Sequence, residues 1–287
     1  MRGLRVDAME IILAKSAGFC FGVRRATQMA FEAAAAHEHI CSLGPVIHSP
    51  QVVKGLAEQG VKVVSNVDEI PPGSVIIRSH GVTLEEMDKI QQKNLTIVDA
   101  TCPFVKKAQE YAARLSEEEY TVVIVGEVEH PEVQGILSYS GDTVVHVVAD
   151  AGQAAALPRM KKVGIVAQTT QLYENLEAIM DVCLAKSQEL RVFNTICDAT
   201  SVRQNEAREI ARAVDLMFVI GGHASANTSR LARICKEIQP QTWHIETAEE
   251  IAPECFAGVS KVGVTAGAST PRWLIDEVVA RITALGK

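Results

Sequence analysis

Apolar and polar positions alternate along the chain in two rhythms, one typical of buried strands and one typical of helices. Short apolar runs such as Val122–Val125 and Leu216–Ile220 stand between longer mixed stretches of helical length. Other β-rich runs lead into acidic helix starts at residues 61–70, 144–153 and 242–251. Strands that alternate with helices in this way indicate parallel sheets and an α/β fold.

The alternation contains a threefold repeat organised around three of the seven cysteines. In each copy a β-type run precedes the cysteine, and a helix-like stretch with an early valine and basic residues follows it. We expect the third helix to begin about two residues later than the others, because Val202 lies five residues after its cysteine rather than three. A glycine lies 24 residues after each cysteine. The copies centre on Cys20, Cys102 and Cys197, and the glycines are Gly44, Gly126 and Gly221.

This repeat predicts three similar α/β lobes, with expected bounds at residues 15–100, 101–195 and 196–287. The strand before each cysteine is expected to join the sheet of the preceding lobe. Residues 9–14 would then pair with the third lobe and close a ring. We expect residues 1–8 to be a disordered extension or the product of an upstream start.

Polar loops follow several predicted strands, at the carboxyl ends where open α/β sheets bind ligands. If the lobes pack around a pseudo-threefold axis with these ends inward, the three cysteines meet at one point. The polar side chains expected around that point are His48, His80, His130, Glu132, Thr169, Ser225, Asn227 and Ser269.

The residues alone leave three interpretations of the repeated cysteines open. They could be small buried residues that only pack, or they could bind zinc together with a fourth ligand such as His130. Widely spaced thiolates can also hold an iron–sulfur cluster, and three of them on a four-iron cluster would leave one iron open to substrate. The other four cysteines, Cys41, Cys183, Cys235 and Cys255, lack the repeat context and are expected to pack.

The neutral donors in the predicted loops suggest an anion site. Histidine, serine and asparagine side chains beside glycines, at strand ends and helix starts, are typical of an anion cradle. His130-Pro131-Glu132 fits a helix start whose acidic residue complements the helix dipole, and in an inward loop the same carboxyl group could deliver protons. The sequence contains neither a nucleotide P-loop motif nor the dinucleotide G-x-G-x-x-G motif.

Charge and hydropathy narrow the function classes. The 28 basic and 35 acidic side chains leave a formal charge of −7, which argues against non-specific binding to nucleic acid or anionic membranes. No apolar run approaches the roughly 20 residues that span a bilayer, and the N-terminus does not read as a signal peptide. We therefore expect a cytoplasmic protein. Four basic residues at predicted helix starts form either a solvated face or a docking patch for an electron carrier: Arg24, Arg25, Lys106 and Lys107.

From about Met9 to the C-terminus the sequence resembles the LytB family of 4-hydroxy-3-methylbut-2-enyl diphosphate reductases. The resemblance is carried by many motifs in one order, and it departs from the family at Ala226, where the family loop usually has a second serine. These motifs are GFCFGV, GPVIHSP, RSHGV, DATCPFV, EHPEVQG, QTT, TICDAT, SANTSRL and TAGASTP.

The resemblance implies a fold, a cofactor and a reaction. The fold would be a cloverleaf of three α/β lobes around a central [4Fe-4S] cluster, one per chain, held by the three repeated cysteines. The enzyme would convert 4-hydroxy-3-methylbut-2-enyl diphosphate into isopentenyl and dimethylallyl diphosphate, the last step of the non-mevalonate isoprenoid pathway. Ferredoxin or flavodoxin would donate the electrons.

The resemblance also implies individual residue roles. Glu132 would donate protons, and Thr169 would position the substrate hydroxyl and relay protons. The diphosphate would be held by His48, His80, Ser225, Asn227 and Ser269, with His130 lining the same cavity. A protein without catalytic activity that binds a metal or senses redox state through the same cysteine triangle is the alternative. Such a protein would have no need of Glu132.

Overall fold

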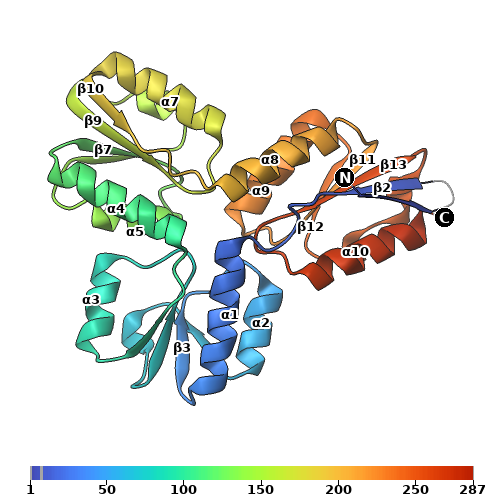
Figure 1. Ribbon diagram of the computed structural model, residues 1–287, viewed down its shortest axis with the longest axis horizontal. Coiled ribbons are helices and arrows are strands. Elements are labelled where there is room, and N and C mark those ends of the chain that lie inside the picture. The colour runs from blue at the N-terminus through green and yellow to red at the C-terminus, as the bar shows by residue number, and fades with distance from the viewer. Residues whose placement is uncertain (1, 7–8, 287) are drawn as a thin grey trace. The chain divides into compact units, whose positions relative to one another are not determined.

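The structure is a computed structural model that describes residues 2–6 and 9–286, with side chains from residue 9 onward. The described chain divides into two compact units, and Figure 1 labels elements of both. One contains the described residues up to Arg24, His48–Val52 and the described residues from Asp198 onward. The other contains Arg25–Ile47 and Val53–Cys197.

Three sheets confirm the predicted α/β class and its threefold repeat. Within each sheet the strands run in the spatial order second, first, third and fourth of the repeat, and all of these pairs are parallel. In the sheet of the first unit, the strand before Cys20 takes the fourth place. The predicted lobe bounds and the cloverleaf arrangement stay predictions.

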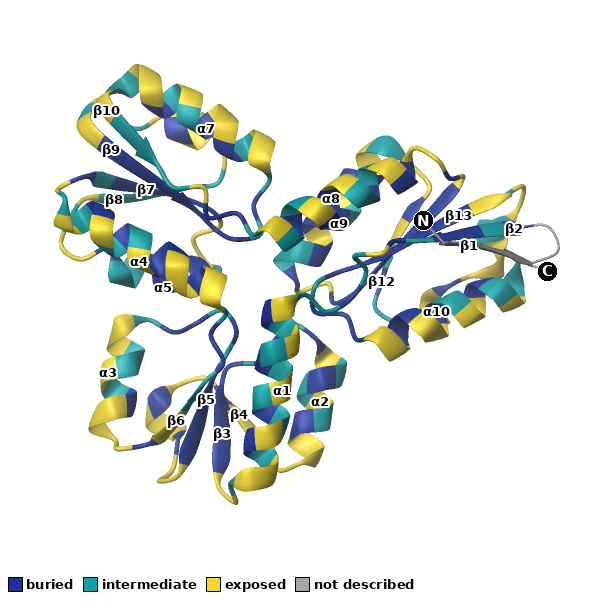
Figure 2. Cartoon of the chain, in the orientation of Figure 1, coloured by how far each residue is buried: buried dark blue, intermediate teal, exposed yellow. Residues whose placement is uncertain are grey.

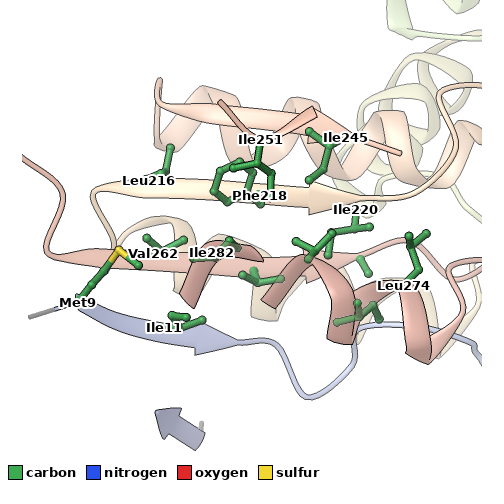
Figure 3. Close-up of a cluster of buried hydrophobic side chains, with 14 residues drawn as sticks. Met9, Ile11, Leu216, Phe218, Ile220, Ile245, Ile251, Val262, Leu274 and Ile282 are labelled. Atoms are coloured by element: carbon green, nitrogen blue, oxygen red, sulfur yellow. The ribbon is translucent and has the colours of Figure 1, made fainter. Parts of the chain in front are cut away.

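The sheet of the first unit has the order β1-β2-β13-β11-β12. Leu216, Phe218 and Ile220 point to the face covered by α10, and Met217 and Val219 to the face covered by α8 and α9. Figure 3 shows the first of these cores. Both faces are buried, which explains the unbroken apolar run of β11. The elements are β1 (Arg2–Val6), β2 (Met9–Leu13), α8 (Asp198–Ala211), β11 (Leu216–Ile220), α9 (Ala226–Ile238), β12 (Thr242–Ile245), β13 (Lys261–Ala266) and α10 (Arg272–Leu285), with short 3₁₀ turns at Ala248–Glu250 and Pro253–Phe256.

The second unit contains the other two sheets. The first of them has the order β4-β3-β5-β6. Its strands are β3 (Ile40–Leu43), β4 (Lys62–Val64), β5 (Ser74–Ile77) and β6 (Thr96–Asp99). The chain segments between and before these strands form α1 (Phe21–Ala36), α2 (Pro50–Glu58), a 3₁₀ turn at Val67–Glu69 and α3 (Leu84–Gln92). The second, β10-β9-β7-β8, comprises β7 (Thr121–Val125), β8 (Val145–Val148), β9 (Met160–Ala167) and β10 (Ser187–Val192), with α4 (Pro103–Glu117), α5 (Pro131–Tyr139), α6 (Ala151–Ala155) and α7 (Tyr173–Lys186). The central strands of both sheets are buried, while the helices expose their outer faces (Figure 2).

The repeated glycines close the first strand of each sheet, as the spacing predicts. The amide of each glycine donates to the carbonyl of the last residue of the second strand: Gly44 to Val64 at 2.8 Å, Gly126 to Val148 at 3.0 Å and Gly221 to Ile245 at 2.9 Å. A Cβ on Gly126 would lie 2.7 Å from the Val133 side chain, and a Cβ on Gly221 2.6 Å from Thr270 Oγ1. Glycine is therefore needed for close approach at these two positions.

Two expectations were wrong, one about the start of α8 and one about the N-terminal residues. All three helices after the repeated cysteines begin at the next residue, so α8 does not begin late. Val202 misled the prediction because it is exposed, and the buried position equivalent to Val105 is Thr200. Residues 2–6 are not a disordered extension: they form β1, which pairs antiparallel with β2 and caps that edge of the sheet. Residues 1, 7 and 8 lie outside the described residues.

None of the helices in the described part of the chain is long and apolar enough to cross a membrane.

We expect Leu115→Ala to lower the free energy of unfolding by about 2–5 kcal/mol, because it opens a cavity in a closed core. Leu115 on α4 is fully buried and lies against Gly164 of β9, where an added Cβ would meet its Cδ2 at 2.5 Å. Urea denaturation of the variant and the parent measures the difference. Leu184→Ala on α7 is the control, since Leu184 is 62% exposed; equal losses in both variants would contradict this description of the core.

Candidate functional site

The three repeated cysteines occupy equivalent positions. Each lies directly before a helix of at least 14 residues, and each donates its amide to a carbonyl two residues beyond the third strand of a sheet. The bonds join Cys20 to Ala268 at 3.3 Å, Cys102 to Ser79 at 2.9 Å and Cys197 to Thr169 at 3.0 Å. This backbone hydrogen bond therefore places each cysteine beside a loop that contains predicted site residues.

The chemistry of these cysteines suits an iron–sulfur cluster. All three are half-buried and stand at helix N-termini, and cysteine sulfur is the usual ligand of iron–sulfur clusters. The other four confirm the expected packing role: Cys41, Cys183 and Cys235 belong to hydrophobic cores, and Cys255 packs against one. Burial raises the pKa of the three core thiols, that of Cys235 to about 12.

The convergence of the cysteines stays a prediction. Cys20 belongs to one compact unit, and Cys102 and Cys197 belong to the other. Over residues 2–6 and 9–286, no three His, Cys, Asp or Glu side chains are gathered as a metal site. The zinc and the cluster interpretations therefore rest on the donor chemistry of the individual residues.

Glu132 and Thr169 form a buried pair in the second unit. Glu132 is only 2% exposed, and both of its carboxylate oxygens accept hydrogen bonds from Thr169. The Thr169 amide donates to Oε1 at 2.6 Å, and Thr169 Oγ1 donates to Oε2 at 3.0 Å. Because the Thr169 carbonyl also accepts the Cys197 amide, the carboxylate is tied through one residue to the cysteine turn.

His130 begins α5 as its N-cap, with Pro131 at the first helical position, as the sequence predicts. Its Nδ1 accepts the Glu132 amide at 3.1 Å, so a neutral imidazole carries its proton on Nε2. The His130 ring lies edge-on to the His80 ring, with 5.5 Å between centroids. The second unit thus brings together four of the predicted residues: His80, His130, Glu132 and Thr169.

The first unit contains the other four, and two of them are in contact. Ser269 Oγ donates to the His48 carbonyl at 3.0 Å, so these two loops are joined. Ser225 caps α9, and its Oγ accepts the Thr228 amide at 3.3 Å. The Nδ2 of Asn227 is buried without a hydrogen-bond partner among the described residues. A donor of this kind at a helix N-terminus is suited to an anion.

Three of the four basic residues at helix starts have partners within the protein. Lys106 forms an ion pair with Asp99 at 2.5 Å, and Lys107 forms one with Glu110 at 3.0 Å. Arg25 donates from Nη1 to the Thr101 carbonyl at 3.1 Å. The two lysines thus have the exposed, locally paired character of a solvated face, while Arg25 holds backbone next to Cys102.

Sequence reasoning missed Thr195, which fixes the segment that leads to Cys197. Its Oγ1 accepts the Ala167 amide at 2.8 Å and donates to the Ala167 carbonyl at 2.5 Å. One side chain thereby continues the β9–β10 ladder beyond the last paired residue of β10. Thr195 belongs to the TICDAT motif, but nothing in its spacing distinguishes it from other strand threonines.

The sequence matches the family described as LytB protein over residues 11–283. A relative from Syntrophotalea carbinolica named 4-hydroxy-3-methylbut-2-enyl diphosphate reductase is 64% identical over 279 residues, which cover 97% of this chain and 100% of the relative. A relative of the same name from Geobacter sulfurreducens is 62% identical over 274 residues, covering 96% of this chain and 97% of the relative.

Solved structures that are similar to this chain include two reductases. One, titled (E)-4-hydroxy-3-methyl-but-2-enyl diphosphate reductase, the terminal enzyme of the non-mevalonate pathway, has 46% identity and a TM-score of 0.69, covering 96% of this chain and 99% of its own. The other, the E-1-hydroxy-2-methyl-but-2-enyl-4-diphosphate reductase from Plasmodium falciparum, has 24% identity and a TM-score of 0.90, covering 97% and 89%. At that identity the second likeness concerns the fold alone.

We expect Thr195→Val to destabilise the protein by about 1–3 kcal/mol, because the Ala167 amide and carbonyl lose their partner in a buried place. Thermal or urea unfolding of the apoprotein measures the loss. Thr96→Val is a matched control on the exposed side of β6. If the two substitutions have equal effects, Thr195 does not hold this segment.

Proposed function

The chain belongs to the LytB family, and we propose that it catalyses the reductive dehydroxylation of 4-hydroxy-3-methylbut-2-enyl diphosphate to isopentenyl and dimethylallyl diphosphate. Two electrons and two protons enter the reaction, and the allylic hydroxyl leaves as water. One proton joins that leaving oxygen, and the other joins carbon in the product.

The buried Glu132–Thr169 pair is the observation that carries this proposal. An ionised carboxylate in a nearly water-free place is unfavourable unless it is hydrogen-bonded, and Thr169 supplies two donors from one residue. A carboxylate held in this way keeps a fixed direction and can exchange a proton through the threonine hydroxyl. We assign Glu132 as the proton donor to the leaving oxygen and Thr169 as its positioning and relay partner.

The fit of the cysteines supports a cofactor assignment. Cys20, Cys102 and Cys197 would hold a [4Fe-4S] cluster, because three cysteine sulfurs form the soft donor set that such clusters require. When bound, such a cluster would supply the electrons and a Lewis-acidic iron for the substrate hydroxyl. An acidic electron carrier such as ferredoxin or flavodoxin would reduce it.

The diphosphate would be bound by neutral donors. Asn227 Nδ2 and the His130 Nε2–H can donate without bringing a second charge into the site. Ala226 stands at the first position of α9, where a backbone N–H has no intrahelical acceptor and is available to an anion. The substitution of the usual serine therefore removes one side-chain donor and keeps one backbone donor. The remaining members of this cradle are His48, His80, Ser225 and Ser269.

These donors would fix the anionic end of the substrate, so that its hydroxyl-bearing carbon faces the proton donor. A protein that only senses redox state has no use for this arrangement. The cytoplasmic location remains a prediction.

We expect Glu132→Gln to lower turnover by at least about 100-fold while the iron and sulfide content stays unchanged, because amide and carboxylate differ in proton transfer but not in size. Oxygen-free assays with chemically reduced protein measure the rate. Glu127→Gln, which lies earlier in the same loop, is the matched control and should retain activity. Full activity in Glu132→Gln would contradict its assignment as proton donor.

A further inference from the structure

Helix α8 holds the chain segment that leads to Cys20. Arg203 is only 3% exposed, and its guanidinium donates to two carbonyls of that segment. Nη1 donates to the Ser16 carbonyl and Nη2 to the Gly18 carbonyl, both at 2.8 Å. Two parallel bonds from one planar group fix direction as well as distance.

Glu206, one turn further along α8, holds the same segment by its amides. Its carboxylate accepts the Lys15 amide at 2.7 Å, the Ser16 amide at 2.8 Å and the Ser16 hydroxyl at 2.5 Å. Burial works against the charge, but the Ser16 hydroxyl and the two amides together keep the pKa of Glu206 below its ordinary value. Residues 15–18 are therefore bound through both their donors and their acceptors.

The segment is a short turn that belongs to no helix or strand. It connects β2 to α1, and Gly18 within it adopts a φ of +99°, which only glycine takes readily. The backbone itself adds two hydrogen bonds along this stretch: the Ala17 amide donates to the Ala14 carbonyl, and the Cys20 amide donates to the Ala268 carbonyl, both at 3.3 Å. Arg203 and Glu206 together supply five hydrogen bonds to residues 15–18, so they are the main polar contacts that hold the turn before Cys20.

A second arginine holds the backbone before another repeated cysteine in a similar way. Arg25 lies on α1, the helix after Cys20, and its bond to the Thr101 carbonyl holds the residue directly before Cys102. In both cases a guanidinium on the helix after one repeated cysteine binds a backbone carbonyl shortly before another.

We propose that Arg203 and Glu206 are positioning residues for Cys20 and that Arg25 is one for Cys102, holding the cysteine turns in the conformation that receives a cluster. This inference rests on the proposed function, since it treats the cysteines as cluster ligands. The side chains act on the backbone before each cysteine, and none of them is assigned to substrate or to proton transfer.

Conservative substitutions of Arg203 and Glu206 distinguish the geometry of each side chain from its charge. Arg203→Lys keeps the positive charge but offers a point charge in place of a two-armed fork, so it cannot bind both carbonyls in the same geometry. Glu206→Gln replaces one acceptor oxygen with an amide donor, which faces either the Lys15 or the Ser16 donors. Matched controls on the solvent side of the same region are Arg212→Lys and Glu209→Gln, since both residues are exposed.

Amide hydrogen exchange of the apoprotein tests whether the clamp exists. We expect the backbone amides of residues 15–20 to exchange about tenfold faster or more in Arg203→Lys and Glu206→Gln, as the loss of charge-assisted bonds predicts. Exchange in the strands should not change. The two control variants should match the parent, and unchanged protection of residues 15–20 in both test variants would overturn the proposal.

Cluster retention tests the ligand role. With iron- and sulfide-loaded protein kept free of oxygen, we expect a chelator to remove iron at least about fivefold faster from Arg203→Lys, Glu206→Gln and Arg25→Lys than from the parent, and the electron paramagnetic resonance spectrum of the reduced protein to change. Loss rates and spectra equal to those of the parent would overturn the proposal. A parent that binds no iron and sulfide would instead contradict the proposed function itself, so the two failures are distinguishable.

Discussion

The backbone hydrogen bond between each repeated cysteine and the loop after a third strand is the interaction on which the candidate site depends. It occurs in the same form at Cys20, Cys102 and Cys197, although the side chains around it differ. Because the parallel sheets align their carboxyl ends, one such bond places a thiol beside the loop that contributes His80, Thr169 or Ser269. The threefold repeat therefore places a cysteine in the same way in each copy, while the polar side chains of the neighbouring loop differ from copy to copy.

The division of chemistry among the copies has a physical basis. Glu132 is tolerated in a buried place because Thr169 presents an amide and a hydroxyl to its two oxygens. The serine and asparagine of the α9 start, in contrast, have no carboxylate as a hydrogen-bond partner in the described part of the chain, and their polar groups are suited to an anion. The proposed proton donor and the α9 members of the proposed cradle thus lie on different loops.

The strands could be predicted from the sequence because β11 and its equivalents are buried on both faces and read as apolar runs, whereas their order within each sheet leaves no such pattern. The spacing of the repeated glycines and cysteines predicted where the first strand of each sheet ends and where the cysteine turns lie. The start of α8 was harder to predict from the sequence. Val202 has the residue type of a core position but is exposed, and Thr200 occupies the buried position instead. Arg203 and Glu206 could not have been found, since their partners are backbone atoms nearly two hundred residues away in the chain, and backbone carbonyls leave no mark in a sequence.

Cys20, Cys102 and Cys197, and no other cysteines, are proposed to hold the iron–sulfur cluster. Oxygen-free purification followed by analysis of iron, acid-labile sulfide and visible absorption tests it, in the parent and in serine variants of Cys20, Cys102, Cys197 and, as control, Cys255. We predict about four irons and four sulfides per chain, lost in each of the first three variants and kept in Cys255→Ser. One zinc and no sulfide in the parent, or full cluster content in any of the first three variants, would contradict the account.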